Sequence, residues 1–322
     1  MKNTKRETWA FPLRALAIPA SLLLCASLAC TAPAPQETTE EVTAPTSSVR
    51  LSYTGCGITK KAFMAELAEA YKAKTGVEID ISGGGATKGI SNASAGNADL
   101  GGGCRHKIAG TEEANAQQVH VAWDALVSVV HPDNPVSSLT SEELKNILTG
   151  ETTLWSTVGG DSAVRIAVGA RNGKISGVGR MVRELIFNDV GADYASDALS
   201  YPSSGPLEQA VESTRSMIGM TGVSSAKKRA VKILSIDGIE PTYDNIASGK
   251  YPYFRPLFIY VGADASPEVR DFLEFARGPE AQALIRAQGT VNLEDGAGLA
   301  SQYADTMRSL QLQPELWELA SL

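Results

Sequence analysis

The sequence predicts an α/β protein with mainly parallel sheets, because strand-like runs alternate with segments of helical periodicity. In one such segment Phe63, Leu67 and Tyr71 recur at every fourth position, which places them on one face of a helix. Ligand sites in folds of this kind lie at the carboxyl ends of the strands. The runs rich in Val, Ile and Ala that predict strands are 77–81, 119–131 and 164–169.

Three helices have recognisable ends. The first is expected over about 60–74, with Thr59 in the cap position and Gly76 at its end. The second begins at Thr140–Glu143, which has the spacing of a capping box. The third is expected over about 177–187, with its apolar side chains facing the core.

The amino terminus predicts export. Basic residues precede an apolar run at 15–29 that is shorter than the roughly 20 residues of a membrane-spanning helix, so residues 1–29 are interpreted as a signal peptide. Cys30 follows in the position of a lipoprotein's lipid-bearing cysteine, and the alternative is cleavage at the small-x-small site 32–34. Residues 30–49 are rich in Pro, Thr and Ser and predict a disordered tether. We therefore expect a periplasmic or extracytoplasmic protein held to a membrane by a lipid anchor.

Charge and cysteine content exclude some classes of protein. The formal net charge is −7, and the basic leader makes the remainder more acidic still, which argues against binding nucleic acid. The chain has four cysteines, of which only Cys56 and Cys104 lie beyond the leader and tether. That number excludes a disulfide scaffold but allows one bridge in an oxidising compartment.

Four loops that leave a strand and enter a helix are rich in Gly, Ser or Thr. Such loops present free backbone N–H groups at the positive end of a helix and can together hold an oxyanion. They do not form a nucleotide P-loop, because no Gly-Lys-Ser/Thr follows at the required spacing. The loops are 54–59, 82–88, 101–107 and 170–177.

The order and spacing of several motifs resemble the PstS-like phosphate-binding family of type II periplasmic binding proteins, from about Arg50 to the end of the chain. The motifs are TGCGIT (54–59), GGGATKGI (83–90), NADLGGGCR (97–105), the segment 131–160, ARNGKISG (170–177), SMIGMTG (216–222) and GKYPYFRPLFIY (249–260).

The resemblance implies two α/β lobes joined by a hinge that closes on a small anion, by default phosphate. Lobe 1 would comprise 50–127 and a return segment 241–322, and lobe 2 would comprise 128–240. The resemblance also implies a monomer that works with the permease and ATPase subunits of an ABC importer. No cofactor and no metal are expected.

The resemblance also implies a set of ligand-binding residues, all of which lie in the four loops. Arg171 suits an oxyanion because its planar fork donates two hydrogen bonds, although a salt bridge is the alternative. Thr59 and Ser176 could equally be helix caps. Some hydroxyls of the family are missing, since Cys104 replaces a Ser or Asp and Val178 replaces a Thr. The expected ligands are Thr59, Gly84, Gly85, Cys104, Arg171, Ser176 and Gly177.

By this alignment Cys56 and Cys104 lie in adjacent ligand loops, where they would either form a disulfide or act as thiol ligands. Positive charge from Arg105 and His106 would lower the pKa of Cys104. The ligand would then be a thiophilic oxyanion such as arsenite, or a soft metal held by Cys56, Cys104 and His106. For each thiol alone, a buried inert cysteine is the simpler interpretation.

Three functions follow from the sequence. The first is a transport receptor without catalysis, and the second is an enzyme with Cys104 as nucleophile and His106 as base, which lacks an evident orienting group. The third is the same fold binding an organic or thiophilic ligand for transport or sensing. His120 and His131 are expected to be core or edge residues, and the core is expected to contain Trp123, Trp155 and Tyr260.

Overall fold

The computed structural model describes residues 49–161 and 163–309. The predicted signal peptide, the lipidation site at Cys30 and nearly all of the predicted tether lie outside the described residues. No helix within the described ranges is long and apolar enough to cross a membrane.

One half of the molecule contains the strands that lead into the first three predicted loops, which are 54–59, 82–88 and 101–107. Its strands follow the order β2-β1-β3-β11-β4, in which β2, β1 and β3 run parallel and β11 is antiparallel to its neighbours. Their bounds are β1 Arg50–Gly55, β2 Glu78–Gly83, β3 Leu100–Gly103, β4 Gln117–Val130 and β11 Phe254–Val261.

The other half continues from the far end of β4 through β8, β6 and β7. Here β6 is parallel to both neighbours, while β8 and β9 are antiparallel to β4. The bounds are β6 Ala167–Arg171, β7 Leu199–Tyr201, β8 Met217–Gly222 and β9 Lys232–Ile233, with a small separate sheet of β5 Ser138–Leu139 and β10 Ser235–Ile236.

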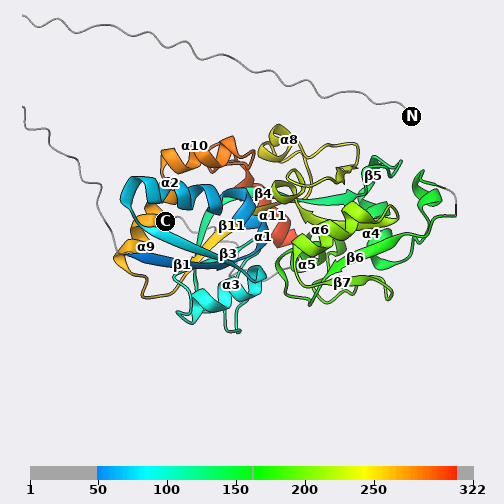
Figure 1. Ribbon diagram of the computed structural model, residues 1–322. Helices are drawn as coiled ribbons and strands as arrows, with labels where there is room; N and C mark the ends of the chain where they lie inside the picture. Colours follow the sequence, from blue (N-terminus) through cyan, green and yellow to red (C-terminus); the bar gives the residue numbers. More distant parts are fainter. Residues whose placement is uncertain (1–48, 162, 310–322) are drawn as a thin grey trace, which may run out of the picture. The chain divides into compact units, whose positions relative to one another are not determined.

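Strand β4 joins the two halves. Its residues up to Ala125 pair with β11, whereas Leu126 and those that follow pair with β8. The chain crosses a second time between β10 and β11, and Figure 1 shows the two sets of strands on either side of β4. The fold is thus two-lobed, as expected. The expectation of mainly parallel sheets was wrong at the centre, because the crossing strand and the returning strand run in opposite directions.

The first helical run contains one correction. It comprises α1 Gly57–Thr59, a π-helical turn Lys60–Met64 and α2 Ala65–Thr75, and it ends at Gly76 in the left-handed conformation, as predicted. The cap, however, is Cys56, whose sulfur accepts the backbone N–H of Thr59. Thr59 is therefore inside the first turn and not at its cap.

The other predicted helices form where expected. Helix α4 (Ser141–Thr149) has a complete capping box between Thr140 and Glu143, and α5 (Gly177–Val182) continues through a π-helical turn Arg183–Phe187. The remaining helices are α3 Gly85–Ser94, the 3-10 turn Trp155–Val158, α6 Ser204–Ser213, α7 Val223–Ala226, α8 Tyr243–Ala247, α9 Pro267–Arg277, α10 Pro279–Ala287 and α11 Leu299–Ser309.

The aromatic residues predicted to be core are buried. Trp123 contacts His120 edge to face, with ring centroids 4.5 Å apart, and Tyr303 of α11 packs against Trp123. Trp155 is buried, and its indole N–H donates to the carbonyl of Ser216. These contacts belong to the core, with Trp123 on β4 and Trp155 at the start of the 3-10 turn Trp155–Val158.

Candidate functional site

The loops after β1, β2, β3 and β6 meet between the lobes. A Cβ atom placed on Gly177 would lie 2.7 Å from the sulfur of Cys104 and 3.0 Å from the Cβ of Ala86. Any side chain at position 177 would therefore clash, so glycine is needed for the start of α5 to approach lobe 1. This contact brings two predicted ligand residues, Cys104 and Gly177, together across the lobes.

Arg171, at the end of β6, carries the main electrostatic feature of the site. Its side chain is 7% exposed, and its Nε and Nη1 atoms have no hydrogen-bond partner. A Cβ on Gly85 would lie 3.9 Å from Nη2, so the guanidinium faces the start of α3. Burial lowers the pKa of Arg171, and nearby Cys104 and Cys56 partly offset this effect. A buried guanidinium with unused donors is costly unless an anion compensates it.

Gly85 and Gly84 form the turn before α3. Gly85 has φ 82°, a left-handed conformation that favours glycine, and Gly84 is the exposed residue before the helix. The turn places the start of α3 beside the guanidinium of Arg171. The structure thus places Gly85 at the site and Gly84 at its edge.

The two remaining predicted ligands use their hydroxyls within the protein. Thr59 Oγ1 lies 2.6 Å from the hydroxyl of Tyr53 and donates to the carbonyl of Cys56 at 3.0 Å. Ser176 precedes α5 without a side-chain cap bond, and its Oγ donates to the carbonyl of Gly173 at 3.2 Å. Both lie in the loops that meet, and their contact with a ligand stays a prediction.

Cys56 and Cys104 are both buried, and they are free thiols in the structure. The predicted disulfide is therefore not formed. The neighbouring side chain of Cys104, together with bonds from Thr59 and the charge of Arg255, lowers the pKa of Cys56 from 9.0 to about 6. The pair can share one negative charge, which rests on Cys56 because Thr59 N–H and Oγ1 also lie within 3.4 Å of its sulfur.

The expectation that Arg105 and His106 lower the pKa of Cys104 was wrong. The neighbouring side chain of Cys56 and burial raise the pKa of Cys104. Arg105 is paired with Glu113 through two bonds of 2.6 and 2.8 Å, so its charge is already balanced. Burial lowers the pKa of His106 to about 3, and its ring packs against Phe258.

The soft-metal set of Cys56, Cys104 and His106 is also not assembled. Within the described part of the chain, no three His, Cys, Asp or Glu residues form a group that could hold a metal ion. The ring of His106 is hydrogen-bonded instead to Gln118, at 2.9 Å. This position gives no support to a Cys104–His106 catalytic pair.

The sequence reasoning missed a second buried cation. Arg255 on β11 is fully buried and paired at 3.0 Å with Asp124 on β4, and its Nε and Nη1 atoms have no hydrogen-bond partner. Both Cys56 and Cys104 are close enough to interact with its charge. A charged residue inside an otherwise apolar strand was the available signal, since such a residue is seldom buried without a partner.

Several bonds join the lobes around these loops. Arg105 Nε and Thr87 Oγ1 of lobe 1 both donate to the carbonyl of Ile175 in lobe 2, at 2.8 and 3.1 Å. Lys61 reaches across to Glu208. The thiols and Arg171 are therefore enclosed, and a ligand would contact both lobes at once.

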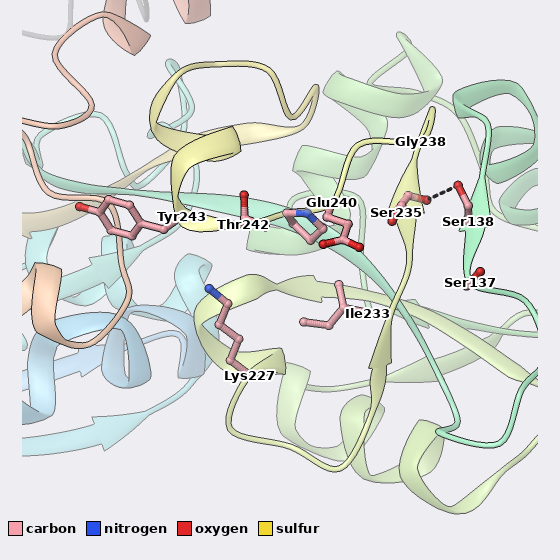
Figure 2. A pocket seen from close by; sticks show the side chains of 10 residues that line it. Ser137, Ser138, Lys227, Ile233, Ser235, Gly238, Glu240, Thr242 and Tyr243 are labelled. Atoms are coloured by element: carbon pink, nitrogen blue, oxygen red, sulfur yellow. Dashed lines mark hydrogen bonds between the residues drawn. The ribbon is translucent and has the colours of Figure 1, made fainter.

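A separate hollow of about 700 Å³ lies in lobe 2 and the returning segment, and Figure 2 shows its lining. Lys227, Ile233 and Tyr243 are among the residues that line it, and a bond from Ser138 to the carbonyl of Ser235 lies at its edge. Its lining includes none of the predicted ligand residues. It is therefore distinct from the enclosed site.

Fold and site together define a two-lobed binding protein whose lobes meet over a buried cation. A sequence model described as the PBP superfamily domain matches residues 43–280, and the chain belongs to this superfamily. The predicted resemblance to PstS-like proteins is confirmed. The chain is 28% identical over 191 residues to the phosphate-binding protein PstS of Borreliella burgdorferi. The aligned residues cover 56% of this chain and 68% of that protein.

Two solved structures resemble the fold. One is a substrate-binding protein from Clostridium perfringens with bound phosphate, at 27% identity and a TM-score of 0.68. The other is an ABC-type phosphate transport receptor from Vibrio cholerae, at 28% identity and a TM-score of 0.59. Each match covers 76% of this chain and 99% of the other chain.

Proposed function

We propose that this protein is the solute-binding component of an ABC importer and captures a small oxyanion, phosphate, between its lobes. The observation that carries the proposal is the guanidinium of Arg171, which is enclosed at the lobe junction with two unused donor atoms. An oxyanion would accept both donors in the bidentate geometry that arginine favours. The phosphate-related names of the relatives support the choice of ligand.

The local charge balance supports an anion. Arg171 and Arg255 are both buried near the thiols, and Asp124 is the carboxylate that pairs with Arg255. With both thiols protonated, a small anion would balance the remaining positive charge and complete the bonds of Arg171. The proposed ligand contacts are Arg171 with the loop residues Thr59, Gly84, Gly85, Cys104, Ser176 and Gly177.

The ligand would act by stabilising the closed arrangement of the lobes. Strand β4 changes sheets between Ala125 and Leu126, and this position suits one strand of the hinge. We place lobe 1 at 50–127 and 241–322 and lobe 2 at 128–240. Binding of this kind needs no covalent chemistry, and we propose that the protein is not an enzyme.

The wider setting follows from the same proposal. The protein would act outside the cytoplasm as a monomer, held to a membrane through lipidated Cys30 after removal of residues 1–29. It would deliver its ligand to permease and ATPase subunits. The resemblance to transport receptors and the leader-like amino terminus support this arrangement.

The test is phosphate binding by calorimetry in wild type and Arg171→Ala. Loss of two charge-assisted hydrogen bonds, each about 1.5 kcal/mol, predicts at least about 100-fold weaker binding. The melting temperature without phosphate should not fall, because the substitution removes an uncompensated buried charge. Arg165→Ala is the matched control, since Arg165 forms an exposed ion pair with Asp197. Unchanged phosphate affinity in Arg171→Ala would refute the proposal.

A further inference from the structure

The two buried thiols of Cys56 and Cys104 are the only sulfur groups among the residues of the described chain that we assign to the proposed anion site. Cys104 contacts the start of α5 in the other lobe, and the backbone N–H of Cys56 donates to the carbonyl of Gly102, two residues before Cys104. Cys56 also caps the first helix through its sulfur. Two sulfurs from different loops therefore lie close enough to Arg171 to interact with its charge.

The surroundings favour one class of thiol ligand over another. Soft thiolates bind thiophilic centres. A bare metal cation would lie close to two buried guanidinium groups, those of Arg171 and Arg255, and their repulsion disfavours it. The described residues also supply no third metal-ligating side chain. An uncharged or anionic oxyacid with a thiophilic central atom meets neither difficulty.

We propose that Cys56 and Cys104 form a dithiol subsite for a trivalent, thiophilic oxyacid, of which arsenite is the simplest. The inference rests on the proposed capture of a small oxyanion between the lobes. The open lobes admit the oxyacid, and closure then brings Arg171 onto its remaining oxygen. The subsite would make the two cysteines the residues that determine specificity.

The binding step is a condensation without redox change. Two As–O bonds of arsenous acid break and two As–S bonds form, to Cys56 and Cys104. The two hydroxyl groups leave as water: one takes the proton of Cys104, and the other takes the proton of Cys56 or, when Cys56 is a thiolate, a proton from solvent. The third oxygen stays on arsenic, where the unused N–H groups of Arg171 can donate to it. In the reverse step two water molecules are consumed: they hydrolyse the two As–S bonds and regenerate both thiols.

The experiment uses the intact, reduced chain and measures thermal stabilisation by sodium arsenite alone and by sodium phosphate alone. The variants are Cys56→Ser, Cys104→Ser and the double substitution. Thiol titration after arsenite treatment counts the protected thiols, with the double variant as the blank for the other cysteines. We expect two protected thiols in the wild type and at least a hundredfold weaker arsenite response in each single variant.

The outcomes separate the two proposals. A phosphate response without an arsenite response would overturn the dithiol subsite and leave the proposed function intact. Three other results would also overturn the dithiol subsite and leave the proposed function intact. The first is arsenite stabilisation that survives in both single variants, and the second is a Cys56–Cys104 disulfide that reductant cannot open. The third is a response to zinc alone that needs both thiols. An arsenite response without a phosphate response would support the subsite and overturn phosphate as the ligand.

Discussion

The ammonium nitrogen of Lys61, in lobe 1, lies 3.1 Å from a carboxylate oxygen of Glu208, in lobe 2. Glu208 is fully buried and also accepts hydrogen bonds from Thr221 and Ser225. Lys61 additionally donates to Ser225 at 2.9 Å. The pair thus links the first helical run to α6 when the lobes are together.

Lys61→Met should weaken phosphate binding about fivefold, because the lost inter-lobe bonds contribute about 1 kcal/mol to the closed state. Calorimetry measures the effect. Lys60→Met is the matched control, since Lys60 is the exposed neighbour on the same turn. Equal affinities in the two variants would show that the pair does not favour closure.

Removal of one partner of the Arg255–Asp124 pair should destabilise the protein strongly. Both side chains are fully buried, so Arg255→Leu or Asp124→Leu leaves an unpaired buried charge and should cost about 3 to 5 kcal/mol in the free energy of unfolding. The double variant should recover part of that loss. Urea unfolding of the wild type, the two single variants and the double variant gives the coupling free energy between the two side chains. If the losses of the single variants simply add in the double variant, the two residues do not interact directly.

Stability should depend on pH through Cys56. Its pKa is about 6 in the folded state against an ordinary 9.0, so its contribution is full above pH 9 and is lost as pH falls to 6. We expect wild type to gain about 2 kcal/mol in unfolding free energy over Cys56→Ser between pH 6 and 8. Urea unfolding under reductant measures the difference. A difference that does not vary with pH would exclude a folded-state thiolate.

Acid should destabilise the protein through His106. Burial lowers the pKa of His106 from 6.5 to about 3, so the unfolded chain binds a proton first and stability falls as pH drops from 6.5 toward 3. His106→Gln should reduce that loss by about 1 to 3 kcal/mol at pH 4. His131→Gln, at the end of β4, is the control. Identical acid profiles for wild type and His106→Gln would refute the expectation.

The local features of the chain were predictable because short-range rules govern them. The capping box at Thr140, the glycine end at Gly76 and the long apolar strand that became β4 all depend on residues close in sequence. Loops 82–88 and 170–177 follow the predicted strands that became β2 and β6, whereas loop 101–107 begins within β3 and is not followed by a helix as expected. Motif order supplied the two-lobed arrangement, which periodicity alone does not give.

Only the tertiary structure decided which groups share charge and contact. Arg105 stands next to Cys104 in sequence, yet its charge is balanced by Glu113, whereas Arg255 from a distant strand lies near both thiols. Thr59 likewise lies inside the first turn because the sulfur of Cys56 takes the cap position. Electrostatic energy and hydrogen bonding depend on distance in space and on burial, and chain packing sets both. The sequence by itself therefore determined the elements and the loops, and packing decided the partners within the site.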